Sequence, residues 1–109
     1  MQSYSWSDLP SSAPRPGVTG KTIKGEKVSI SYFEMEPGAE SPLHHHDNEQ
    51  INYVLEGRIQ FTSGEESATL EAGQVVVFAP WEWHLVRNVG PSVAKNLGVL
   101  SPPRHGDPK

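Results

Sequence analysis

Cysteine is absent from the 109-residue sequence, which excludes disulfide bonds, thiol catalysis and thiolate metal sites together. Long apolar runs are also missing, and the longest, 75–79, is far too short to cross a bilayer. The first residues contain neither the basic nor the apolar segment that is typical of a signal peptide. We therefore expect a cytoplasmic protein without a membrane partner.

Clusters of basic residues are equally scarce. The chain carries 9 Lys and Arg against 13 Asp and Glu, which gives a formal net charge of −4. No segment concentrates positive charge, so a surface that binds the phosphates of a nucleic acid is not expected. A chain of this length predicts a single domain, because two separate cores would each fall below the usual stable size.

Glycine and proline, by contrast, are abundant, with 10 residues of each. Residues 1–18 are rich in serine and proline and predict an extended N-terminal arm that lies on the domain or on a partner subunit. Residues 102–109 predict a similar Pro-rich tail. The packed domain is therefore expected over residues 19–101, and a domain of this size often buries further surface by dimerising.

Hydrophobic residues of the predicted domain recur with period two, which is typical of strands. Apolar side chains stand at every second position in the segments 28–32, 51–55 and 59–61. The run 75–78 is uninterrupted and predicts a strand buried on both faces, and 93–100 predicts the last strand. Turn signals rich in glycine and proline separate these segments, so we expect an antiparallel sandwich or barrel of about eight to ten short strands.

One face of the predicted strand at 51–55 is apolar and is expected to pack against another surface. Ile51, Tyr53 and Leu55 lie on the same side and form an apolar outer surface. An exposed apolar sheet face of this kind favours association, so we expect a homodimer joined sheet to sheet.

Three of the five histidines are consecutive. On a strand, His44 and His46 point to one face and His45 to the other. Gln50 shares the parity of His46, and His84 follows a proline-aromatic turn far along the chain. Together these side chains fit an imidazole-rich divalent metal site. A solvated histidine patch is the alternative interpretation, and the run of histidines alone weights the two about equally.

Two sets of spaced residues resemble the conserved motifs of the cupin family. The first set is Gly38, His44, His46, Gln50 and Gly57, and the second is Gly73, Pro80, His84 and Asn88. Several fixed spacings agree at once, which makes the match specific. The resemblance implies an all-β fold, an antiparallel jelly-roll barrel (a double-stranded β-helix) in one domain. It also implies one metal in the barrel mouth, held by His44, His46, Gln50 and His84.

The third ligand position needs a choice between neighbours, because the family usually has glutamate there. Glu49 is adjacent, but Gln50 has the motif spacing to Gly57 and the parity of His46, so we predict Gln50 as the ligand. Three imidazoles and an amide leave the ion its full double positive charge, which polarises an oxygen substrate or a bound water. Without a carboxylate, Mg²⁺ and Ca²⁺ are disfavoured, and Ni, Zn, Fe, Mn or Cu is expected.

The segments 44–57 and 99–104 look most similar to the KdgF group of single-domain cupins. That resemblance implies metal-dependent ring opening of an unsaturated uronate, an isomerase or lyase reaction in which an arginine binds the carboxylate and an aspartate moves protons. Arg104 matches the arginine and is the catalytic and substrate-binding candidate. The aspartate position is Gly98, and a glycine cannot relay a proton.

Two other functions are therefore kept as alternatives. One is a three-histidine metal oxygenase (a dioxygenase), and the other is a non-enzymatic cupin that binds or senses a ligand. In each case the partner is a small molecule. Further contacts to it are expected from Trp83, Asn52 and Gln60. The alternatives are that Trp83 closes the barrel mouth or a dimer seam and that the two amides face solvent.

Overall fold

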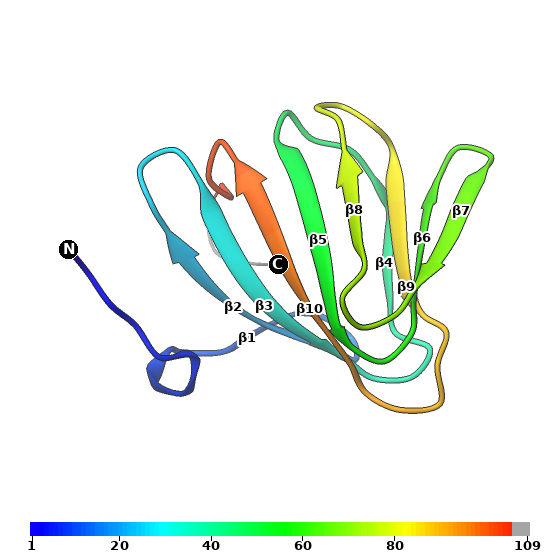
Figure 1. Ribbon diagram of the computed structural model, residues 1–109, viewed down its shortest axis with the longest axis horizontal. Coiled ribbons are helices and arrows are strands. Elements are labelled where there is room, and N and C mark those ends of the chain that lie inside the picture. Colours follow the sequence, from blue (N-terminus) through cyan, green and yellow to red (C-terminus); the bar gives the residue numbers. More distant parts are fainter. Residues whose placement is uncertain (106–109) are drawn as a thin grey trace.

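The computed structural model describes residues 1–105 of the chain, and almost all of its regular elements are strands (Figure 1). The one helical element in that part is a short 3-10 helix, η1 (Trp6–Asp8). The strands are β1 (Ser12–Arg15), β2 (Val18–Lys24), β3 (Ser29–Met35), β4 (Glu40–His44), β5 (Glu49–Glu56), β6 (Ile59–Ser63), β7 (Glu66–Leu70), β8 (Val75–Phe78), β9 (His84–Asn88) and β10 (Ala94–Ser101). Within residues 1–105, no helix is both long and apolar enough to cross a membrane.

The strands form two antiparallel sheets. The larger sheet has the order β1-β2-β3-β10-β5-β8, and the smaller has the order β4-β9-β6-β7. Figure 1 shows β2, β3, β10 and β5 side by side, with β4, β9, β6 and β7 grouped on the other side of the molecule. This arrangement confirms the predicted fold, a jelly-roll barrel of short antiparallel strands.

The hydrophobic core lies between the two sheets. Burial alternates along the central strands, so that every second side chain enters the core, as the period of two predicts. The buried apolar residues of the core are Val18, Met35, Val54, Ile59, Phe61, Phe78, Val86 and Ala94. Both sheets contribute to this cluster, so its side chains fix the distance between the sheets.

Strand β5 shows how the alternation places polar groups inside. Gln50 and Asn52 are buried on its inner face, whereas Ile51 and Tyr53 are exposed on its outer face. The neighbouring strand β10 pairs with β5 and sets Gly98 opposite Asn52. The inner face of the larger sheet therefore carries amide side chains beside a glycine, which is an unusual lining for a barrel core.

The expected burial of both faces of the run 75–78 is wrong. Val75 and Val77 are 49% and 56% exposed, and only Phe78 in this strand is fully buried. The reason is that no described element covers the outer face of this part of the larger sheet, where Ile51 and Tyr53 of the neighbouring β5 are exposed as well. The exposed valines lie beside the outer residues of β5, with Val77 opposite Ile51 and Val75 opposite Tyr53.

Segments near both ends of the described chain lie against the larger sheet. Within the predicted arm 1–18, β1 pairs with β2 and places Arg15 opposite Val18. In the predicted tail 102–109, the backbone N–H of Arg104 donates a 2.8 Å hydrogen bond to Oγ of Ser29, and residues 106–109 lie outside the described part. The domain boundaries proposed from composition stay a prediction.

Candidate metal centre

Three imidazoles come together in the smaller sheet, where the last residue of β4 lies beside the first residue of β9. His44 ends β4, His84 begins β9, and the two residues are paired across the strands. His46 follows two residues after β4, and its ring centroid lies 5.5 Å from that of His44 and 5.0 Å from that of His84. One ring nitrogen from each imidazole lies within 4.8 Å of the others, so the three can hold a single metal ion.

Backbone carbonyls fix the orientation of two of these rings. Nδ1 of His44 lies 2.7 Å from the carbonyl oxygen of Pro42, and Nδ1 of His84 lies 2.9 Å from that of Glu82. In each pair the nitrogen donates, so Nε2 carries the lone pair and is the atom available to a metal. This support of a ligand by a second hydrogen bond is typical of histidine metal sites.

Burial keeps the same two rings neutral. The pKa of His84 is lowered to about 4, chiefly because burial disfavours the charged imidazolium and secondarily because His44 and His46 are close. The pKa of His44 is also lowered, chiefly because its imidazole is partly buried. Since a metal binds the neutral imidazole, both rings are in the ligand form at neutral pH.

Gln50 joins the cluster from the inner face of β5. Its side-chain oxygen Oε1 lies 3.0 Å from Nε2 of His46, whereas the neighbouring Glu49 is exposed. Two ligand atoms that are each about 2.1 Å from one ion lie about 3.0–3.4 Å apart in octahedral or tetrahedral geometry. The separation of these two atoms is therefore the one that a shared ion requires.

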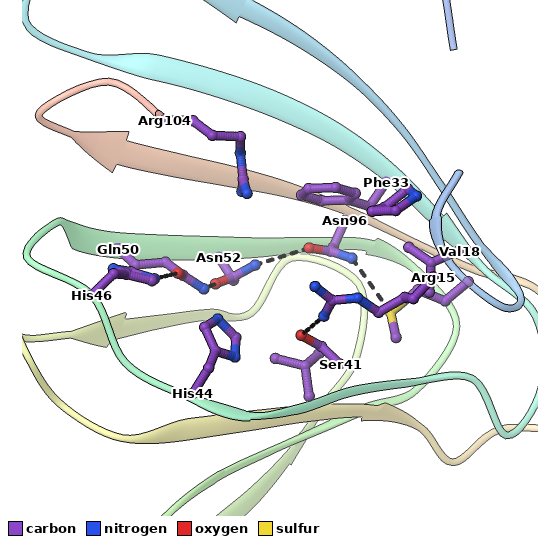
Figure 2. Close-up of a pocket in the computed structure, with 13 residues that line it drawn as sticks. Arg15, Val18, Phe33, Ser41, His44, His46, Gln50, Asn52, Asn96 and Arg104 are labelled. Carbon is purple, nitrogen blue, oxygen red and sulfur yellow. Dashed lines mark hydrogen bonds between the residues drawn. The ribbon is translucent and has the colours of Figure 1, made fainter. Parts of the chain in front are cut away.

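A chain of amides fixes which atom Gln50 presents. Nε2 of Gln50 donates to Oδ1 of Asn52 at 2.7 Å, and Nδ2 of Asn52 donates to Oδ1 of Asn96 at 2.9 Å. Nδ2 of Asn96 in turn points to Sδ of Met35 at 3.9 Å. Because every amide in the chain donates in the same direction, the oxygen of Gln50 is left to face His46 (Figure 2).

A cavity opens beside these ligands, with a volume of about 80 Å³ open to the centre of a water molecule. A single water needs only about 10–15 Å³ by that measure, so the space suits a small molecule. The polar and charged residues that line it are Arg15, Ser41, His44, His46, Gln50, Asn52, Asn96 and Arg104. Figure 2 shows these side chains directed toward a common space between the two sheets.

Arg104 reaches the cavity from the segment after β10. Its guanidinium carbon lies 5.4 Å from the ring centroid of Phe33, and its Nε is buried. The segment after β10 is also held by Asn48, whose side-chain Nδ2 donates a hydrogen bond to the carbonyl oxygen of Pro102. Asn48 lies in the loop between His46 and Gln50, so that loop and the position of Arg104 are joined by one side chain.

Three buried side-chain atoms of the described residues have no hydrogen-bond partner, and all belong to this site. They are Nδ1 of His46, Nε2 of His84 and Nε of Arg104. A buried polar atom without a partner costs about 1–3 kcal/mol, so such atoms are rare unless a ligand or an ion satisfies them. Nε2 of His84 therefore fits a divalent metal and Nε of Arg104 fits an anionic or oxygen-rich ligand, whereas Nδ1 of His46 lies across its ring from the Nε2 that faces Gln50.

Phe33 fills the space beside Gly98. A Cβ at Gly98 would lie 3.3 Å from the ring of Phe33 and 3.6 Å from Nδ2 of Asn52, so a side chain here would point into the cavity. On the other side of the ring, a Cβ at Gly20 would lie only 2.7 Å from it. The ring thus lies between two glycines, where it covers the backbone that they leave open.

Two of the predicted contact residues lie elsewhere. Trp83 is 50% exposed and stacks on His45 with ring centroids 3.9 Å apart, on the outer side of the histidine run. Gln60 alternates with the buried Ile59 and Phe61 of β6, which turns its side chain away from the core. Neither lines the cavity, so their role as ligand contacts stays a prediction.

Sequence reasoning missed Arg15, Ser41, Asn96 and Asn48. Only Arg15 carries a usable signal, because it and Asp8 are the two charged residues in the first eighteen. Asn96 and Asn48 are single polar residues in or beside strands, and nothing in their local pattern separates a buried amide from an exposed one. Their importance follows from contacts between strands that are far apart in the sequence.

Comparison with known proteins gives the site a family context. Residues 31–99 match the profile Cupin_2, described as a cupin domain. Uncharacterized protein MJ1618 of Methanocaldococcus jannaschii is 32% identical over 81 residues, which cover 73% of this chain and 65% of that protein. Gentisate 1,2 dioxygenase 1 of Aquipseudomonas alcaligenes is 35% identical over 70 residues, which cover 63% of this chain.

The match covers only 20% of the dioxygenase, so the chain spans less than two thirds of either curated relative. Among solved structures, KdgF from Halomonas sp. superposes with a TM-score of 0.84 at 21% identity and covers 91% of both chains. At that identity the likeness shows a shared fold.

Proposed function

Because the chain belongs to the cupin family, whose profile matches residues 31–99, we propose that it binds a small oxygenated molecule at one divalent transition metal. The proposed ligands are His44, His46, Gln50 and His84. The observation that carries the proposal is the set of buried atoms without partners, since Nε2 of His84 faces the imidazole cluster with nothing to satisfy it.

Bound by neutral ligands, an ion of Ni, Zn, Fe, Mn or Cu would keep its double positive charge and polarise an oxygen atom of the bound molecule. The protein's own residues then supply orientation. Gln50 is held by Asn52, and Arg104 presents an unpaired Nε toward the cavity, where it suits a carboxylate. Phe33 supports the guanidinium from one side.

For the reaction class we propose Lewis-acid isomerase or lyase chemistry on a carbohydrate-derived acid such as an unsaturated uronate. Support comes from the neutral ligand set, from Arg104 in the cavity and from the KdgF-like fold. Gly98 stands where a proton-relaying aspartate would be needed, and the described residues that line the cavity include no aspartate or glutamate. Among the described residues proton movement would then fall to water in the cavity or to the substrate's own groups.

A second candidate is a three-histidine dioxygenase. It is favoured by the 35% identity to gentisate 1,2 dioxygenase 1 and by the three imidazoles that lie together in this site. A third possibility is a non-enzymatic cupin that binds a ligand, and the experiment below distinguishes it from the two enzymes.

The experiment compares one preparation loaded with Zn or Ni and one loaded with Fe(II). The first is incubated with a 4,5-unsaturated uronate, and loss of the ultraviolet absorbance of its conjugated double bond supports the isomerase or lyase. The second is incubated with gentisate in an oxygen electrode, and oxygen uptake supports the dioxygenase. Binding of either molecule without turnover in both preparations contradicts an enzymatic role and supports the binding protein. Neither binding nor turnover contradicts both substrate classes.

We also infer that the protein is a homodimer. Five apolar side chains of β5 and β8 form one exposed outer face: Ile51, Tyr53, Leu55, Val75 and Val77. Large contiguous apolar patches are rare on monomeric proteins, and a two-fold axis lets the same face of a second copy cover this one. The predicted cytoplasmic location stays a prediction.

A further inference from the structure

The segment that carries Arg104 leaves the larger sheet at the point where the loop of the proposed ligands enters it. β10 ends at Ser101, which pairs with Glu49, the first residue of β5. The loop 45–48 directly precedes Glu49 and contains His46. Strand pairing therefore brings this loop next to the segment 102–105, and Figure 2 shows the side chain of Arg104 directed into the cavity from beside β10.

Asn48 is the buried link between the loop and this segment. Its side chain is only 3% exposed, although the residue lies in a loop, where polar side chains usually face water. Its Nδ2 donates to the carbonyl oxygen of Pro102 and, at 3.4 Å, to that of Pro103. These two carbonyls immediately precede Arg104, so the amide holds the backbone from which that guanidinium projects.

Two further contacts hold the same segment. The backbone N–H of Arg104 donates to Oγ of Ser29, which is 2% exposed, and this bond ties the segment to β3. Nε2 of His105 lies 3.5 Å from Oδ1 of Asp47, but both side chains are exposed, and an exposed pair contributes little. Of the described contacts between the segment and the ligand loop, the buried one at Asn48 is therefore the one expected to transmit a change.

The proposed ligands stand on both sides of Asn48. His46 precedes it by two residues and Gln50 follows it by two, and Nε2 of His46 lies 3.0 Å from Oε1 of Gln50. An ion held by both side chains would fix the two ends of the short stretch that contains Asn48. A stretch with fixed ends has less conformational freedom, so the amide between them would hold its carbonyl partners more firmly.

From this arrangement we propose that Asn48 is a positioning residue that couples the metal site to Arg104. Metal bound by His46 and Gln50 fixes the segment 102–105, and an anion bound by Arg104 strengthens metal binding in return, because coupling between two binding sites is reciprocal. Asn48 is not among the residues that line the cavity, so it acts through the backbone that it holds. This coupling rests on the metal site proposed above.

Hydrogen exchange of the backbone N–H of Arg104, followed by NMR with and without Zn²⁺, tests the first direction. Exchange measures how often the bond from this N–H to Ser29 opens. We expect Zn²⁺ to slow it about fivefold or more in the unmodified chain and less than about twofold in Asn48→Ala. A purely structural role would speed exchange in Asn48→Ala equally with and without Zn²⁺, and that result overturns the proposal.

Two further variants separate the link from the general attachment of the segment. Ser101→Ala removes a 2.8 Å hydrogen bond from Oγ of Ser101 to the carbonyl oxygen of Lys27, which holds the same segment but does not reach the ligand loop. It should keep the full effect of Zn²⁺. Asn48→Gln retains an amide donor and should recover part of it. Loss of the Zn²⁺ effect in Ser101→Ala as large as that in Asn48→Ala would contradict the assigned link.

The reverse direction is measured as the zinc affinity with and without D-galacturonate, by competition with a chromophoric chelator and after correction for zinc bound by the free sugar acid. We expect galacturonate to raise the affinity about fivefold or more in the unmodified chain and clearly less in Asn48→Ala. Direct contact of the sugar acid with the ion would act in both proteins, so the difference between them isolates Asn48. Equal ratios in two folded proteins overturn the coupling and leave the metal site standing, whereas an unmodified chain that binds no Zn²⁺ contradicts the metal site and the coupling together.

Discussion

Nδ2 of Asn52 donates a 2.9 Å hydrogen bond to Oδ1 of Asn96, and this bond joins the inner faces of β5 and β10 next to the proposed metal centre. It is the middle link of the chain that turns the oxygen of Gln50 toward His46. The proposed ligand Gln50 is thus oriented by two residues that are not themselves among the proposed ligands.

Asn52→Leu tests this link. The change frees Nε2 of Gln50, so the amide can present either end, and we expect metal affinity to fall about tenfold, as for other lost supports of metal ligands. Competition with a chromophoric chelator measures it. Gln60→Leu, which makes the same kind of replacement on the outward side of β6, is the control. Unchanged affinity in a folded Asn52→Leu protein would show that the amide chain does not orient the ligand.

Because Phe33 packs more tightly against Gly20 than against Gly98, replacing each glycine by alanine is predicted to destabilise the protein by a different amount. Gly20→Ala would bring its Cβ to 2.7 Å from the ring, whereas Gly98→Ala would bring its Cβ to 3.3 Å. We expect the first change to lower the free energy of unfolding by roughly 1–3 kcal/mol and the second by less, because overpacking displaces the ring. Urea denaturation compares both with Thr19→Ala, an exposed position on β2. A larger loss for Gly98→Ala would refute this packing.

The low pKa of His84 predicts how the metal-free protein responds to acid. Its value falls from 6.5 in the unfolded chain to about 4 in the folded one, so between these values only the unfolded chain binds the proton. The free energy of unfolding therefore falls as pH drops from about 7 to 4, by roughly 3 kcal/mol from this residue. The lowered pKa of His44 acts in the same direction.

Urea denaturation of chelator-treated protein at pH 7 and pH 4.5 measures this loss. His84→Gln should flatten the dependence, while Thr19→Ala, at an exposed position on β2, should leave it as it is. A His84→Gln protein that loses as much stability in acid as the unmodified chain would contradict the assigned cause.

The apolar outer face predicts a change of oligomeric state. Tyr53→Lys or Val77→Lys places a charge in the middle of the face formed by β5 and β8, where burial against a second copy would be costly. We expect light scattering to show a dimer for the unmodified chain and a monomer for either variant, with the fold retained. Thr69→Lys, at an exposed position on β7, is the control. A monomer before any substitution would remove the proposal.

Much of this fold was predictable because one physical signal repeats along the chain. Strands with one buried face alternate apolar and polar residues, and the turns between them carry glycine and proline. The same parity separated Gln50 from Glu49, and the structure places the first inside and the second outside. The expected burial of Val75 and Val77 failed because an apolar run does not reveal whether the outer face of its sheet is covered.

The candidate site was predictable only in part. The imidazoles form a motif that the sequence shows directly, whereas the cavity wall is made by side chains brought together from distant strands. Asn96 and Arg15 enter it through the pairing of β10 with β5 and of β1 with β2, and no local pattern encodes that outcome. Trp83 was predicted to contact the ligand because it precedes His84 in the sequence, although adjacent residues of a strand point to opposite sides.

The metal content of the purified chain, measured by elemental analysis beside two variants, tests the central claim most directly. We predict one equivalent of a divalent transition metal in the unmodified chain and in His45→Ala, whose ring stacks outside on Trp83. His84→Ala should lose it, because the paired imidazole across β4 and β9 is gone. Full metal content in a folded His84→Ala protein, or none in the unmodified chain after exposure to each candidate metal, would contradict the account.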